Sequence, residues 1–61
     1  MHGLYVMRTK RGLTQSELAE KLGVRSSTIS QYESGKRSPN VKMLTKLAKV
    51  LKCTVSKLVE E

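Results

Sequence analysis

The sequence predicts an all-α protein, built as a bundle of five short helices. Apolar residues recur three or four positions apart along most of the 61 residues, which is the spacing of one helix face. Polar capping residues and glycines stand where these segments begin and end. No segment shows the apolar–polar alternation of a half-buried strand, and the chain has no internal repeats. One domain covering residues 1–61 is therefore expected, with residues 1–3 frayed.

The first two helices are bounded by glycines. The first is expected over residues 4–11, where a basic last turn suits the negative end of the helix dipole and Gly12 can end the helix. Thr14 and Glu17 then form the T-x-x-E capping pattern that begins the second helix. Gly23 ends that helix in a sharp turn. The apolar residues that the second helix buries are Leu18, Ala19 and Leu22.

The third helix is expected over residues 26–34, with Ile29 as its principal inward residue. A solvated helix face usually carries Glu and Lys, whereas this outer face carries hydroxyl groups and one amide. Its members are Ser26, Ser27, Thr28, Ser30 and Gln31, with Arg25 beside them. Such groups are suited to hydrogen-bonding the edges of another molecule. We interpret that molecule as DNA.

The last two helices supply the rest of the core. Asn40 is a good N-cap for a regular helix over residues 41–51, and Thr54 can cap a short final helix. The apolar stripe of the longer helix is Val41, Leu44, Leu47, Ala48 and Leu51. Away from that stripe lie Lys42, Lys46 and Lys49. The final helix adds Val55, Leu58 and Val59.

Charge and composition restrict the class of protein. The 12 Lys and Arg against 5 Asp and Glu give a net charge of +7, which indicates an anionic partner, although excess Lys also keeps small domains soluble. Cys53 is the single cysteine, so a disulfide within the chain and a Cys-based zinc site are excluded. We expect no metal or other cofactor, no membrane span and a cytoplasmic location.

In its motifs the chain resembles the phage-repressor helix-turn-helix family, the Cro and cI-type domains also called XRE-like. The matching segments are GLTQSELAEKLGV over residues 12–24, STISQYESGKRSP over 27–39 and LTKLAKVL over 44–51. The resemblance implies a compact five-helix lambda-repressor-like domain. Such a domain binds double-stranded DNA at a pseudo-palindromic operator as a symmetric homodimer, with the helix at about 26–34 in the major groove.

That resemblance also implies a function and a setting. The function is that of a sequence-specific transcriptional regulator, most simply a repressor, in a prokaryotic or phage-encoded, nucleoid-associated protein. An enzyme is not expected, because the chain has no paired carboxylates on one face and no phosphate-cradling glycine pattern. The operator sequence and any small-molecule inducer are not identified by the sequence.

Site residues follow from the resemblance, position by position. The residues implied to face the bases are Arg25, Ser26, Ser27, Thr28 and Gln31. The residues implied to contact phosphates are Thr14, Gln15, Lys36, Arg37, Ser38 and Asn40. Ser38 and Asn40 are interpreted equally well as turn residues. Arg8 and Glu33 are implied to form a structural ion pair between the first and third helices.

Candidate dimer contacts lie near the C-terminus. They are Val50, Val55, Leu58 and Val59, all of which are interpreted equally well as members of the monomer core.

Three positions depart from the family pattern. Arg25 stands where a capping Ser or Thr is common, so either Ser26 caps the third helix or the cap is lost. Lys52 replaces a usual Gly, and Cys53 is interpreted as core filler.

Two other functions compete with gene control. A protein-interaction module, such as an antitoxin or an anti-repressor, has the same fold, so fold alone does not separate it from a DNA-binding protein. Clustering of Arg25, Lys36 and Arg37 with the hydroxyl face favours DNA. A membrane-active basic helix is disfavoured, because the apolar residues are divided among five short helices and the chain has no Trp or Phe.

Overall fold

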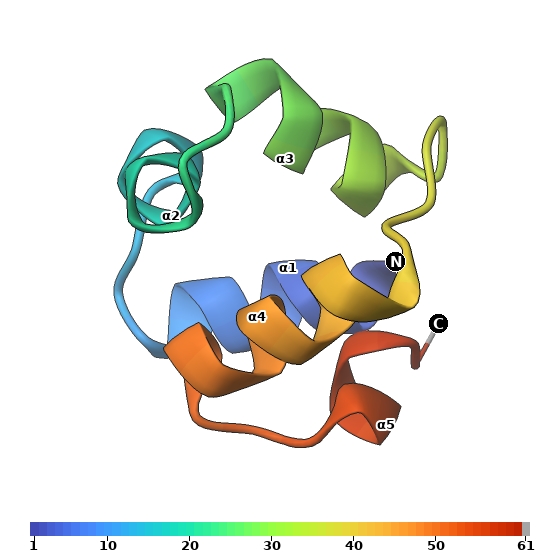
Figure 1. Ribbon diagram of the computed structural model, residues 1–61. Coiled ribbons are helices and arrows are strands. Elements are labelled where there is room, and N and C mark those ends of the chain that lie inside the picture. Colours follow the sequence, from blue (N-terminus) through green and yellow to red (C-terminus); the bar gives the residue numbers. More distant parts are fainter. Residues whose placement is uncertain (61) are drawn as a thin grey trace.

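The structure, a computed structural model, describes residues 1–60 and confirms the all-α fold. Those residues form five helices and no strand. In chain order the helices are α1 (His2–Lys10), α2 (Gln15–Leu22), α3 (Ser26–Ser34), α4 (Val41–Leu51) and α5 (Val55–Leu58) (Figure 1). α3 lies at one end of the bundle, and α4 and α5 lie toward the other.

Short polar side chains begin three of these helices. The Thr14 hydroxyl accepts from the backbone N–H of Glu17 at 3.0 Å, and the Glu17 carboxylate accepts from the N–H of Thr14 at 2.9 Å, which is a complete capping box. Asn40 accepts from the N–H of Met43 at 2.8 Å at the start of α4. Thr54 does the same for Lys57 at the start of α5. Local sequence therefore determines where α2, α4 and α5 begin.

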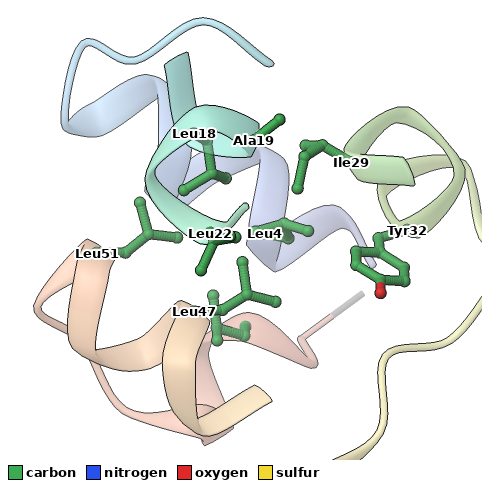
Figure 2. Close-up of a cluster of buried hydrophobic side chains, with 9 residues drawn as sticks. Leu4, Leu18, Ala19, Leu22, Ile29, Tyr32, Leu47 and Leu51 are labelled. Carbon is green, nitrogen blue, oxygen red and sulfur yellow. The ribbon is translucent and has the colours of Figure 1, made fainter. Parts of the chain in front are cut away.

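A single core joins all five helices. Its buried members are Leu4, Leu18, Ala19, Leu22, Ile29, Tyr32, Leu47, Leu51 and Leu58 (Figure 2). Fully burying one leucine contributes roughly 1.5–3 kcal/mol relative to leaving it exposed. Cys53 is partly buried against this core, and burial raises the pKa of its thiol. A core of this size gives a domain of 61 residues only a modest stability.

The N-terminus differs from the expectation that residues 1–3 are frayed. Helix α1 begins at His2, and the ammonium group of Met1 donates to the carbonyls of Tyr32 and Glu33 at 3.2 and 3.4 Å. Gly3 is buried, and its N–H donates to the carbonyl of Glu60 at 2.7 Å. These contacts with α3 and with the residues that follow α5 order the segment, so the expectation is corrected.

The first residue of α4 also differs from the expected core. Val41 is 79% exposed, although it has the angular position of the apolar stripe. It is the first residue of the helix. Leu47 and Leu51, further along the same helix, are completely buried. The apolar stripe of α4 thus enters the core only after its first turn.

Helix α4 ends on a residue in the left-handed conformation. Lys52 has φ 54° and ψ 50°, and it is the only non-glycine residue of the described chain with positive φ. A side chain in this region is strained, which is why glycine is usual there. The guanidinium of Arg11 donates to the carbonyls of Leu51 and Lys52 at 2.8 and 3.1 Å. Arg11 thereby satisfies carbonyls that the end of α4 leaves without a helical partner.

Candidate DNA interface

A tight turn sets the angle between α2 and α3. Gly23 adopts the left-handed conformation with φ 70°, and the N–H of Val24 donates back to the carbonyl of Ala19 at 3.0 Å. α3 begins only three residues after Gly23, at Ser26. Ala19 is 2% exposed and lies opposite Ile29 in the core (Figure 2). The small methyl group of Ala19 therefore lets the two helices approach closely.

The outer face of α3 carries small hydroxyl side chains. Ile29 and Tyr32 are buried, so the opposite side of the helix faces solvent. The exposed residues on it are Ser26, Ser27, Ser30 and Ser34, while Thr28 and Gln31 are half-buried at its margin. Arg25, just before the helix, is exposed. Of the residues expected to face bases, three are thus exposed and two are partly covered.

No side chain caps the start of α3. Arg25 is the N-cap residue and makes no side-chain hydrogen bond to the first turn. Of the two alternatives that the sequence left open, the structure therefore shows the lost cap, and Ser26 is already the first residue of the helix. Losing a Ser or Thr cap costs about 1 kcal/mol. The Arg25 side chain makes no hydrogen bond to the helix and so stays available for another contact.

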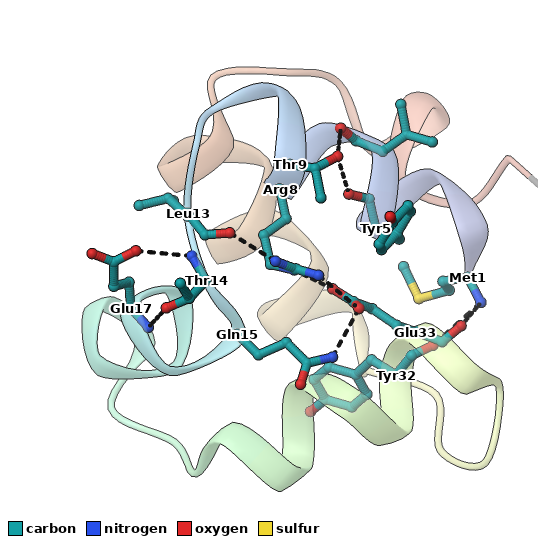
Figure 3. Close-up of polar contacts among 11 residues, drawn as sticks. Met1, Tyr5, Arg8, Thr9, Leu13, Thr14, Gln15, Glu17, Tyr32 and Glu33 are labelled. Atoms are coloured by element: carbon teal, nitrogen blue, oxygen red, sulfur yellow. Dashed lines mark hydrogen bonds and ion pairs between the residues drawn. The ribbon is translucent and has the colours of Figure 1, made fainter.

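Arg8 anchors the far end of α3. Its guanidinium pairs with the carboxylate of Glu33 through Nε and Nη2, and the side chains of the two residues are only 10% and 9% exposed (Figure 3). Nη1 donates to the carbonyl of Leu13 at 2.7 Å. The Tyr5 ring lies 5.5 Å from the guanidinium carbon. The structure thus brings together the two residues expected to pair, and it links α1, the α1–α2 loop and α3.

Gln15 joins this ion pair. Its amide donates to Oε1 of Glu33 at 3.0 Å, and the side chain is half-buried (Figure 3). The sequence had indicated only a phosphate contact for Gln15, because the bond to Glu33 spans 18 residues and no local pattern reveals it. Gln15 and Glu33 also line a shallow hollow beside α3. Its lining residues are His2, Tyr5, Gln15, Ser30, Glu33 and Ser34.

The basic loop after α3 is attached to that helix through its backbone. Gly35 ends α3 with φ 84°, and the N–H of Arg37 donates to the carbonyl of Gln31 at 3.2 Å. Lys36, Arg37 and Ser38 are exposed. Asn40 is also exposed, but its side-chain oxygen caps α4. The loop cations are therefore held next to the hydroxyl face.

The candidate dimer contacts divide into two kinds. Leu58 is 0% exposed, so it belongs to the monomer core and is withdrawn as a surface contact. Val55 and Val59 are 38% and 47% exposed, and Val50 is half-buried. Val41, which the helical spacing predicts in the core, is an exposed apolar residue.

The described part of the chain lacks two other kinds of feature. Residues 1–60 contain no group of three or more His, Cys, Asp or Glu side chains placed to hold a metal ion. None of their helices is long and apolar enough to cross a membrane. What the geometry does show is a capped helix, a sharp turn and a second helix with an open polar face beside a basic loop. That arrangement defines a helix-turn-helix domain.

Comparison with known proteins shows the family. The sequence model described as helix-turn-helix matches residues 4–58. The chain is 43% identical over 51 residues to an uncharacterized HTH-type transcriptional regulator of Archaeoglobus fulgidus, covering 84% of this chain and 73% of that protein. The chain belongs to the XRE-type helix-turn-helix family, a family of DNA-binding transcriptional regulators.

Two further relatives have opposite regulatory names. The chain is 36% identical over 55 residues to the cryptic phage CTXphi transcriptional repressor RstR of Vibrio cholerae, covering 90% of this chain and 50% of RstR. It is 42% identical over 55 residues to the HTH-type transcriptional activator BcrR of Enterococcus faecalis, covering 90% of this chain and 27% of BcrR. The chain therefore spans half or less of these two relatives.

Proposed function

We propose that this protein is a sequence-specific regulator that reads double-stranded DNA with α3, residues 26–34, in the major groove. The observation that carries the proposal is the exposed hydroxyl face of α3, which has Arg25 at one end and Lys36 and Arg37 at the other. Small hydroxyls let a helix approach base edges closely, and the flanking cations match the phosphates on either side of the groove. Repression is the simplest outcome, since a domain that occupies an operator excludes other proteins from it.

The base contacts proposed are Arg25, Ser26, Ser27, Thr28 and Gln31. An Arg fork can pair with guanine, and a Gln amide with adenine, each discriminating by about 1–3 kcal/mol. Serine hydroxyls accept or donate and discriminate less. Because Thr28 and Gln31 are half-buried, their side chains are pre-positioned at the margin of the face. Specificity on this face then depends mainly on Arg25 and Gln31.

The phosphate contacts proposed are Thr14, Gln15, Lys36, Arg37, Ser38 and Asn40. Gln15 stands at the first turn of α2, where backbone N–H groups favour an anion. Its amide has two N–H donors, so one can hold a phosphate while the other stays on Glu33. Thr14 and Asn40 already use their side-chain oxygens as helix caps. Lys36 and Arg37 are therefore the main phosphate-binding side chains, and Ser38 adds a hydroxyl beside them.

A homodimer on a pseudo-palindromic operator completes the proposal. One helix reads only a few base pairs, so two copies bound about one turn apart supply the specificity that a regulator needs. Val55 and Val59 are exposed and Val50 partly so, which leaves them available for an isologous contact. The setting proposed is the prokaryotic or phage-infected cytoplasm, at the nucleoid.

Selection of bound sequences from a random duplex pool tests this function. The expected result is a conserved half-site repeated with two-fold symmetry. Gln31→Ala should change the selected bases, whereas Lys36→Ala should weaken every sequence alike, and Lys21→Ala, a matched exposed lysine at the end of α2, should change neither. Equal affinity for all duplexes would refute sequence-specific reading. A stoichiometric protein partner without DNA binding at moderate salt would favour the protein-interaction module instead.

A further inference from the structure

The positive charge of the chain is concentrated in one segment. Between Glu33 and Glu60 the sequence contains no Asp or Glu, and it contains seven basic residues, a number equal to the net charge of +7. They are Lys36, Arg37, Lys42, Lys46, Lys49, Lys52 and Lys57. Lys36 and Arg37 belong to the loop proposed for the DNA interface. The lysines of α4 have no role so far.

Three of these lysines form a ridge along α4. Lys42, Lys46 and Lys49 are spaced by four and three residues, so they share one face of the helix. At 1.5 Å per residue the ridge extends about 10 Å along the helix axis. All three side chains are exposed. Among residues 1–60 the ion pairs are Arg8–Glu33 and Lys57–Glu60, so the ridge lysines pair with no carboxylate there.

The ridge points away from the hydroxyl face of α3. α4 buries Leu47 and Leu51 in the core, and α3 buries Ile29 and Tyr32 in the same core from another side (Figure 2). Because each helix exposes the side opposite to its buried one, the two exposed faces are directed differently. A duplex docked on α3 therefore leaves the ridge available for another molecule.

The chemistry of the ridge favours phosphates over a protein surface. Lys is depleted in the centres of protein interfaces, which use aromatic, Met and Arg anchors instead. None of the ridge residues is of that kind. A Lys ammonium is a compact charge on a flexible stem, which follows a regular row of phosphates without reading bases. Duplex DNA offers such a row, with one charge about every 1.7 Å of its axis.

We propose that Lys42, Lys46 and Lys49 bind the phosphate backbone of a second DNA duplex, so that one molecule bridges two duplex segments. This inference rests on the proposed function, because the first duplex is the one held by α3. Three phosphate contacts bind weakly by themselves. Where many protein molecules are bound side by side on fixed duplexes, a second duplex can contact several ridges at once, and contacts that are weak singly are then sufficient.

A bridging assay with the full chain tests the inference. A duplex carrying the selected half-sites is fixed to beads, protein is added, and capture of a fluorescent duplex of unrelated sequence is measured from about 50 to about 200 mM salt. The ridge variant is Lys42→Gln with Lys46→Gln and Lys49→Gln. The matched control is Lys10→Gln with Lys21→Gln and Lys57→Gln, which removes the same charge from exposed positions on α1, α2 and α5.

The ridge variant is expected to capture about tenfold less of the second duplex, with binding of the first duplex unchanged and the control variant close to wild type. Removing three phosphate contacts should lower the slope of log affinity against log salt by roughly 2.7, at about 0.9 for each contact. The inference is overturned if the two variants capture alike, if the wild-type protein captures no second duplex, or if poly-glutamate displaces that duplex at equal charge concentration.

The two proposals fail separately in this design. If the first duplex binds without sequence preference, the proposed function fails, and the comparison of ridge and control variants still measures bridging. If the first duplex binds selectively and no bridging depends on the ridge, only the inference fails. A dimer that bridges through its two α3 faces is also recognised, since the ridge variant keeps both of those faces.

Discussion

Removing the carboxylate of Glu33 should severely destabilise the fold. In Glu33→Ala the Arg8 guanidinium, whose side chain is 10% exposed, loses its charged partner and keeps only the Leu13 carbonyl at 2.7 Å and the face of Tyr5. The amide of Gln15 also loses its acceptor. The cost arises less from the lost attraction than from the buried charge that is left without a partner.

Breaking a buried pair in this way costs roughly 3–5 kcal/mol. A domain of 61 residues has a total stability of roughly 3–9 kcal/mol, at about 0.05–0.15 kcal/mol per residue. The single change thus removes a third or more of the stability, and each kcal/mol corresponds to roughly 4–8 °C in Tm for so small a domain. Glu33→Ala is expected to lower Tm by at least about 12 °C.

Thermal unfolding followed by circular dichroism, together with urea titration, measures this effect. The control is the double variant Arg8→Met with Glu33→Leu, which replaces both charges by apolar groups of similar size and should recover most of the loss. The single variants Arg8→Met and Glu33→Leu complete a double-mutant cycle, which gives the coupling between the two positions. A loss below about 1 kcal/mol in Glu33→Ala would contradict the reasoning, because exposed ion pairs already reach that value.

Three further changes test separate parts of the fold. Lys52→Gly should raise the free energy of unfolding by about 0.5–1 kcal/mol in urea titration, since it relieves a left-handed side chain at φ 54°; a decrease would contradict the strain. Gly3→Ala should lower Tm, at a cost of about 1–3 kcal/mol, because the added carbon would meet the carbonyl oxygen of Lys57 at 2.0 Å; an unchanged Tm would contradict that contact. Backbone and side-chain hydrogen bonds with Thr14 lower the pKa of the Glu17 carboxyl from its ordinary value of 4.5. The ionised carboxylate therefore stabilises the fold above pH 4.5, and this stabilisation is lost as the pH falls through the lowered pKa. Glu17→Gln should therefore unfold with a flatter acid profile, and parallel profiles would exclude this role.

All five helices, and the boundaries of α2, α3 and α4, were predictable because their signals are local, whereas α1 begins two residues earlier than expected. Thr14 and Glu17 are three residues apart, and Gly23 and Gly35 directly follow the helices that they end. The inward residues of α2 and α3 follow from helical spacing within one segment. Physical information of this kind is contained in fewer than ten consecutive residues, so it can be read without knowing the tertiary structure.

Contacts between distant segments were not predictable. The bonds from Arg11 to the end of α4 span 40 and 41 residues, and the bond from Gln15 to Glu33 spans 18. The close approach of Gly3 to α5 likewise depends on how the ends of the chain meet. In α5, which has four residues, periodicity is too short to separate buried Leu58 from exposed Val59. These contacts and this difference in burial depend on the tertiary structure, so no short stretch of sequence reveals them.

Little in the sequence of α3 stabilises it as a helix. Four of its nine residues are serines, no side chain caps its start, and isolated helices shorter than about 12–15 residues are marginal in water. Its conformation therefore depends on the residues of its inner side: Ile29 and Tyr32 in the core and Glu33 on Arg8. The residues on the outer side of α3 therefore contribute little to the stability of the fold. Ser26, Ser27 and Ser30 can then be exchanged for other residues, and the bases that are read can change, without loss of the fold.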